Sequence, residues 1–192
     1  MLLDFQATLE IKPEKAIKLE KDALAQIENI AADNARLVSN LHANLGGLYR
    51  MNGYTDLARE HMEKSISLLD QFNLLHINDS IPQIANYAMF LTEQQEPERG
   101  ISELQKLSGI IKEYHSDDCL DYAKVQETLA TIYLMTANLP QAKTHFKRAF
   151  KIYEKIWADE PEMIEAKYQE IQELYPQIGF CIGKTLSGLL TK

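Results

Sequence analysis

Apolar and small side chains recur along this chain with the spacing of amphipathic helices, and the pattern repeats every 42 residues. Gly46, Ala88 and Ala130 occupy one small position of the repeat, with large apolar residues beside it. A second small position follows twelve residues later in each unit, at Ala58, Gly100 and Ala142. Three consecutive units in one register indicate an internal repeat, and an internal repeat decides the fold.

Each unit reads as two amphipathic helices separated by a short turn. In residues 118–159, Val125, Leu129 and Ile132 share one helical face. "TANLPQA" then interrupts the pattern, and Pro140 suits the first turn of the following helix. Gly53 lies in the corresponding turn of the first unit, where we expect a positive φ. The pattern therefore predicts antiparallel helix pairs.

The small positions predict a close approach between the two helices of a pair. Glycine in a helix interior costs about 1 kcal/mol relative to alanine, so Gly46 requires a contact that offsets this cost. We expect the second helix to cross the first at Gly46, with Ala58 as its counterpart and large apolar side chains around the contact.

The segment "LGGLYRMNGYTDLAREHMEKSI", residues 45–66, resembles the tetratricopeptide repeat, with its Leu-Gly-x-x-Tyr start and later Gly, Tyr and Ala. Residues 129–150 fit the same pattern, and residues 87–108 fit it less closely. The standard repeat has about 34 residues; the longer unit is similar to those of kinesin light chains and bacterial peptide-sensing regulators. The resemblance covers residues 34–157 and implies an all-α, right-handed superhelical solenoid of stacked antiparallel helix pairs.

We expect a single tetratricopeptide-like domain over residues 1–192. Full repeats are predicted at residues 34–75, 76–117 and 118–159. Residues 1–33 are predicted to be an N-terminal partial repeat, and residues 160–192 a degenerate C-terminal repeat or capping helices, since terminal repeats are atypical. Because the chain begins almost inside a repeat, we expect it to be the tail of a longer protein or an excised domain.

The resemblance implies that first helices line a concave groove that binds a peptide or a helix. One exposed position there often carries an Asn that holds a peptide backbone; here it holds Asn44, Asn86 and then Thr128. Capture of a C-terminal carboxylate would need more cations, because Lys124 matches one basic position whereas Asn40 and Thr128 replace others. We therefore favour binding of an extended or helical peptide, with ordinary solvated polar positions as the alternative.

Other candidates for the groove neighbour these positions on the first helices. Methionines there would suit adaptable partner binding, or would simply pack. These candidates are Arg50, Met51, Met89, Glu93, Glu127, Thr131 and Met135. Glu170 and Glu173 make the fourth first helix acidic, where a ligand with a basic end would fit.

The predicted function is a non-enzymatic protein–protein interaction module that needs no cofactor. The alternative is a peptide-sensing regulatory domain of a larger, bacterial signalling or transcription regulator. The sequence lacks a nucleophile–base set, a phosphate loop and a dinucleotide fingerprint. "HSDDC", residues 115–119, spaces His115 and Cys119 as metal ligands can be spaced, but no second pair accompanies it. We predict no metal site there, and expect Asp117 or Asp118 to cap the next helix.

Charge narrows the class of partner. The chain holds 20 basic and 28 acidic residues, for a net charge of −8, which argues against nucleic acid. One second helix nevertheless carries a basic stripe, which reads as a solvated outer face or as a docking patch for an acidic protein or nucleic acid. The stripe consists of Lys143, Lys147, Lys151 and Lys155, beside Arg148.

The remaining sequence features concern the cellular compartment of the protein. It has no apolar run long enough to cross a membrane and no basic segment that would start a secretory signal. Cys119 and Cys181 are far apart and predicted to be unpaired thiols in a reducing compartment. We therefore predict a cytoplasmic protein without membrane contact, whose repeat ends self-associate weakly.

Overall fold

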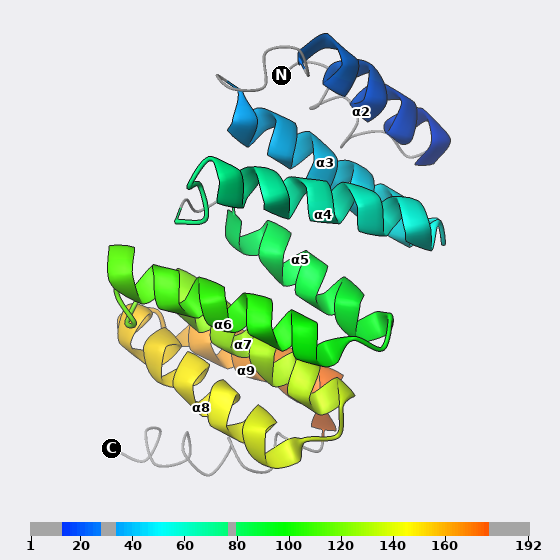
Figure 1. The fold of residues 1–192 in the computed structure, drawn as a ribbon. Coiled ribbons are helices and arrows are strands. Elements are labelled where there is room, and N and C mark those ends of the chain that lie inside the picture. The colour runs from blue at the N-terminus through cyan, green and yellow to red at the C-terminus, as the bar shows by residue number, and fades with distance from the viewer. Residues whose placement is uncertain (1–12, 28–33, 77–79, 177–192) are drawn as a thin grey trace, which may run out of the picture. The chain divides into compact units, whose positions relative to one another are not determined.

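The computed structural model describes residues 13–27, 34–76 and 80–176, which contain eight helices and no strand (Figure 1). None of the helices in these ranges is both long enough and apolar enough to cross a membrane. The chain forms two compact units, Met1–Ile110 and Ile111–Lys192. The single-domain organisation of residues 1–192 stays a prediction.

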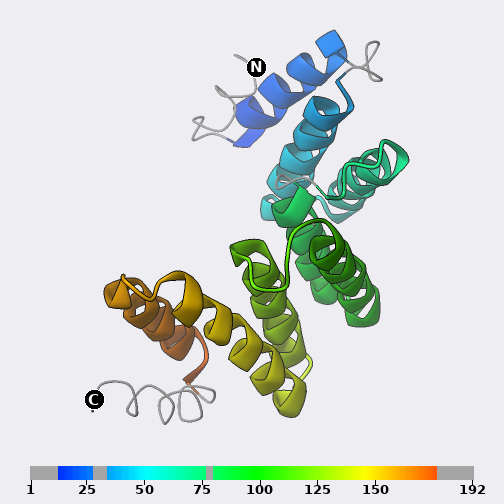
Figure 2. The ribbon, with the colours of Figure 1, turned by 90° about the vertical axis from the view of Figure 1, so that its left-hand side faces the viewer.

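Consecutive helices within each unit alternate in direction (Figure 2). The first unit contains α2 (Pro13–Ile27), α3 (Ala35–Met51), α4 (Thr55–Gln71), α5 (Ser80–Glu93) and most of α6 (Pro97–Tyr114). The second unit contains α7 (Leu120–Met135), α8 (Leu139–Ile156) and α9 (Pro161–Leu174). The second helices α4, α6 and α8 begin 42 residues apart, in agreement with the period of the sequence.

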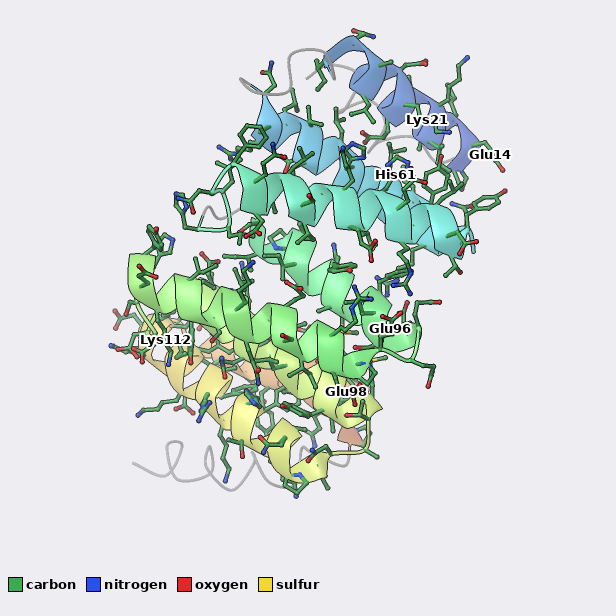
Figure 3. All side chains as sticks on the ribbon, in the orientation of Figure 1. Glu14, Lys21, His61, Glu96, Glu98 and Lys112 are labelled. Atoms are coloured by element: carbon green, nitrogen blue, oxygen red, sulfur yellow. The ribbon has the colours of Figure 1, made fainter. Side chains whose placement is uncertain are left out.

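The turns inside the three helix pairs close in the same way. Gly53, Gln95 and Ala137 stand at equivalent positions and have positive φ angles of 77°, 64° and 58°. In each turn the N–H of the next residue donates to a carbonyl five residues back, as from Tyr54 to Tyr49 at 2.9 Å. This is a Schellman motif. The positive φ predicted for Gly53 is confirmed, and Gln95 adopts it at the turn where Glu96 binds Arg59 and Arg99. Figure 3 labels Glu96 at this turn.

Paired helices approach most closely at the predicted small residues. A Cβ atom on Gly46 would lie 2.5 Å from Cγ of Met62 and 3.3 Å from the carbonyl oxygen of Ala58. In the next pair, a Cβ atom on Gly100 would lie 2.6 Å from the carbonyl oxygen of Ala88. The 2.5 Å and 2.6 Å separations are shorter than real Cβ contacts, and the 3.3 Å separation is tighter than most. The predicted close crossing is therefore confirmed.

Each unit has its own apolar core. In the first unit, α2, α3, α4 and α5 contribute buried side chains that include Leu24, Val38, Leu41, Leu45, Met62, Leu68 and Phe90. In the second unit, α7, α8 and α9 contribute Ala130, Ala142, Phe146, Phe150, Tyr168 and Ile171. Each core lies along the faces that the helical period assigns to the interior.

The cap of α7 differs from the prediction. Cys119, rather than Asp117 or Asp118, is the N-cap residue, with extended φ and ψ angles of −95° and 160°. Its Sγ atom accepts a hydrogen bond from the Tyr122 N–H at 3.4 Å. The N–H of Asp118 instead donates to Oγ of Ser116 at 3.1 Å, which places both aspartates in the preceding turn.

Replacing Gly100 by Ala should destabilise the protein, whereas replacing Gly109 should stabilise it. Both glycines lie in α6, and alanine gains about 1 kcal/mol of helix propensity at either position. At Gly100 the added methyl group would overlap a backbone oxygen, which costs about 1–3 kcal/mol. At Gly109 nothing lies within 4 Å of the new methyl group. Urea unfolding of the two variants measures the difference, and equal stabilisation by both would contradict the close crossing.

Ala137→Gly should raise the free energy of unfolding by about 0.5 kcal/mol, because alanine at a φ of 58° bears a left-handed strain that glycine avoids. Part of this gain is lost to the greater freedom of glycine in the unfolded chain. The reciprocal variant Gly53→Ala should lower stability by about 1 kcal/mol. Thermal melts of both variants test the pair, and a lower Tm for Ala137→Gly would show that the turn is unstrained.

Candidate peptide-binding surface

The predicted groove residues fall in both units. Asn40, Asn44, Arg50 and Met51 lie on α3, and Asn86, Met89 and Glu93 lie on α5, all in the first unit. Lys124, Glu127, Thr128, Thr131 and Met135 lie on α7, in the second unit. Within the first unit, the structure joins the α3 and α5 residues at two places.

An ion pair joins the C-terminal ends of α3 and α5. Arg50 donates to Glu93 through Nε at 2.8 Å and through Nη2 at 2.5 Å, so the guanidinium binds both carboxylate oxygens. Such a bidentate pair is directional as well as electrostatic. Two of the predicted groove residues therefore bind each other in this structure.

A buried polar cluster joins the N-terminal halves of the same helices. Gln83 of α5 donates from Nε2 to Oδ1 of Asn40 at 2.5 Å. Its Oε1 atom accepts hydrogen bonds from Ser39 of α3 at 2.8 Å and from Ser65 of α4 at 2.6 Å. Gln83 and the two serines were not predicted as functional residues. The sequence feature that could have revealed them is a polar side chain on an otherwise apolar helical face.

Asn44 and Asn86 occupy equivalent positions but have different surroundings. Asn44 donates from Nδ2 to Oε1 of Glu20 on α2 at 3.1 Å, and Glu20 is buried. The residue 42 positions after Glu20 is Met62, which lines a recess together with Asn86. Asn86 is exposed, and the structure gives its side chain no hydrogen bond to any described residue. The thioether of Met62 thus stands where the N-terminal partial repeat has the carboxylate of Glu20.

Between the Asn40–Gln83 and Arg50–Glu93 links, the α3 side is formed by small residues. Ala43 lines the recess next to Asn86, and no atom lies within 4 Å of the position that a Cβ of Gly47 would occupy. The recess itself is small, about 10 Å³. Met89 is half-buried, whereas Met51 is 84% exposed. We define the α3/α5 strip as Ala43, Gly47, Asn86 and Met89.

Residues 80–155 match the family model of the tetratricopeptide repeat. This segment therefore consists of tetratricopeptide repeat sequence. BtubC (BKLC) from P. vanneervenii has a similar crystal structure, with a TM-score of 0.73 and 17% identity over 93% of this chain and 74% of that chain.

Two crystal structures of a putative kinesin light chain from Podosopora anserina, with nearly identical TPR-like repeats, have TM-scores of 0.66 and 0.64. Each is 14% identical to this chain; they cover 76% and 75% of it, and the matches span 69% and 68% of those chains. These identities show the fold alone. No curated protein sequence matches the chain. The predicted family resemblance and the all-α fold class are confirmed.

In the second unit, most candidate residues of α7 form hydrogen bonds or ion pairs with other residues of the same unit. Glu127 accepts hydrogen bonds from Tyr153 at 2.6 Å and from Lys167 at 2.7 Å, which connects α7 to α8 and α9. Burial raises the pKa of Tyr153, and the Glu127 carboxylate adds to this rise. Thr128 and Thr131 bind carbonyls of their own helix. Lys124 is exposed and lies 3.8 Å from Asp121, and Met135 is 47% exposed.

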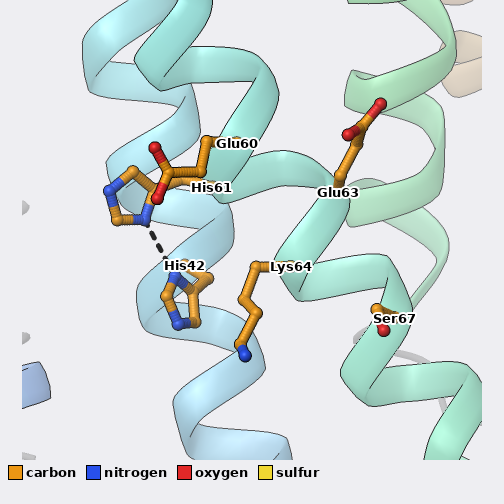
Figure 4. A pocket seen from close by; sticks show the side chains of 6 residues that line it. All are labelled: His42, Glu60, His61, Glu63, Lys64 and Ser67. Atoms are coloured by element: carbon orange, nitrogen blue, oxygen red, sulfur yellow. Dashed lines mark hydrogen bonds between the residues drawn. The ribbon is translucent and has the colours of Figure 1, made fainter.

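A polar pair joins the two helices of the first repeat, residues 34–75, and an equivalent pair joins those of the third repeat, residues 118–159. His42 and His61 contact each other through their Nδ1 atoms at 2.8 Å (Figure 4). Tyr49 stacks on His61. In the third repeat, His145 Nδ1 contacts Oε1 of Gln126 at 2.8 Å, and a tyrosine stacks on His145 in the same way. His42 is buried, as expected for a residue at the edge of the core.

The histidine pair lines a cavity of about 430 Å³ together with Glu60, Lys64 and other α4 residues (Figure 4). Burial, together with the neighbouring charges of His61 and Lys64, lowers the pKa of His42 to about 4. Across the described residues, no group of three His, Cys, Asp or Glu side chains could hold a metal ion. The cavity is therefore best described as a polar hollow over the neutral His42.

Stability should fall as pH falls from 6.5 toward 4, because the unfolded chain then binds a proton at His42 that the folded chain does not. A pKa lowered from 6.5 to about 4 predicts a loss of about 2 kcal/mol between pH 7 and pH 5. His42→Gln should remove this loss while keeping a hydrogen bond to His61, as Gln126 does in the third repeat. Urea unfolding of both proteins at the two pH values measures it; equal pH dependence would show that His42 is not the titrating group.

Proposed function

We propose that this chain is a protein–protein interaction module whose first unit binds an extended or helical peptide along the α3/α5 strip. Tetratricopeptide repeats generally mediate protein–protein interaction. The observation that carries the proposal is Asn86, whose exposed amide borders the recess without a hydrogen bond to the described residues. A side chain that packing and internal hydrogen bonds do not use is available to a ligand.

The chemistry of Asn86 suits a peptide backbone. Its amide offers a carbonyl acceptor and two N–H donors, so it matches the acceptor and donor of one peptide unit. Ala43 and Gly47 have little or no side chain, which leaves room for a backbone to approach α3. Because α3 and α5 are already joined at both ends of the strip, binding requires little ordering of the protein.

The other predicted groove residues receive different roles in this proposal. Asn44 supports the stack by donating to buried Glu20 rather than by holding the ligand. Arg50 and Glu93 close one end of the strip. Met89 in the strip and the exposed Met51 of α3 offer adaptable apolar contacts. Binding at α7, the peptide-sensing alternative and the cytoplasmic location stay predictions.

The test is to select peptides that bind the full chain from a displayed library and to measure their affinity by fluorescence anisotropy. Asn86→Ala should weaken binding about 5- to 30-fold, the loss expected for one or two hydrogen bonds, with an unchanged Tm because Asn86 is exposed. Asn44→Ala should lower the Tm, because the buried Glu20 carboxylate loses a donor.

Gln105→Ala is the matched control, since it removes an exposed amide from α6 in the same unit. It should leave both peptide affinity and Tm unchanged. Peptides that bind wild type and Asn86→Ala equally would remove the α3/α5 strip from the proposal. Peptides weakened by all three variants equally would indicate binding that is not localised to this surface.

A further inference from the structure

Helix α8 carries a line of basic residues on its solvent-facing side. Lys143, Lys147, Lys151 and Lys155 follow one another at four-residue intervals, which separate neighbours by about 6 Å along the helix axis. Arg148 lies beside them, and all except the half-buried Lys143 are exposed. We call these five residues the α8 basic face.

Most of these charges have no carboxylate partner within the described part of the chain. The structure shows an ion pair for Lys155, with Asp118, and that contact lowers the pKa of the aspartate. Among the described residues it shows no ion pair for Lys143, Lys147 or Arg148. Lys151 forms no ion pair within 4 Å, although its charge also helps to lower the pKa of Asp118. By contrast, in the same unit, lysines of α7 and α9 are paired with Asp121, Glu127 and Glu170.

The arrangement is unfavourable for the helix alone. Like charges four residues apart destabilise a helix by about 0.2–0.5 kcal/mol per pair. The only acidic residue on α8 is Glu154, and burial raises the pKa of its carboxyl group. An anionic partner would relieve this repulsion.

The chemistry of the face favours a protein partner over nucleic acid. Proteins that bind single strands place aromatic rings beside their cations for base stacking, but Phe146, Phe150 and Tyr153 of α8 are buried in the core. Carboxylates on a second helix recur at the same four-residue step of about 6 Å.

We propose that the α8 basic face binds an acidic helical segment of another protein, whose Glu or Asp side chains are spaced four residues apart. This surface lies in the second unit and uses none of the residues of the α3/α5 strip. Binding depends on charge and helical spacing, and so it weakens with added salt.

The experiment uses the full chain and a synthetic, alanine-rich helical peptide with Glu at every fourth position over four turns. Lys147→Gln combined with Lys151→Gln should weaken its binding about 3- to 20-fold, as expected for two exposed ion pairs. The matched control combines Lys18→Gln with Lys64→Gln, which removes the same charge from exposed positions of α2 and α4. The control should bind the peptide as the wild type does.

Three comparisons distinguish an acidic helix from the other occupants that this face could hold. A peptide of the same composition with Glu spread around the helix should bind more weakly; equal binding would overturn the proposal. A single-stranded oligonucleotide that binds more tightly than the peptide, and is weakened by the same α8 pair, would assign the face to nucleic acid. Self-association that the α8 pair abolishes, measured by sedimentation, would make a second copy the occupant instead.

Discussion

The close crossing of paired helices at their small residues is the contact on which the rest of the structure depends. A methyl group added at Gly46 would overlap the Met62 side chain, and one added at Gly100 would overlap the carbonyl oxygen of Ala88. A crossing fixed at this point sets which residues of the two helices face each other along their whole length. The turn, the polar pair and the apolar face must therefore keep the same spacing from the crossing in every repeat. This agrees with the constant 42-residue period of the sequence.

The constant frame allows side chains at one position to change role from repeat to repeat. The contact between His42 and His61 is matched in the third repeat by one between Gln126 and His145, at the same distance and beside an equivalent tyrosine. At another position the frame carries Asn86, whose equivalent in the preceding repeat donates to a buried glutamate.

The sequence was sufficient for the helix pairs, the crossing at Gly46 and the positive φ of Gly53, because each depends on local spacing within one repeat. The hydrogen bond from Asn44 to Glu20 and the ion pair from Arg50 to Glu93 were not predicted. Both join helices of different repeats through long side chains, so they depend on inter-helix geometry and rotamers that a periodic pattern does not contain. The predicted N-cap residue of α7 was wrong, because Cys119, a residue type that is uncommon at N-caps, occupies the extended backbone position.

Polar groups that a repeat protein does not use internally are the ones that can bind something else. In the described residues, amides and carboxylates along α3, α5 and α7 are mostly engaged with neighbouring helices. By contrast, the exposed Asn86 amide forms no hydrogen bond to the described residues, and most cations of the α8 basic face form no ion pair with them. A solvated side chain costs little by itself, but a row of like charges on one helix raises its free energy. Such a row therefore argues for a partner more strongly than a single exposed amide does, and the single amide argues for a directional contact that charge alone cannot supply.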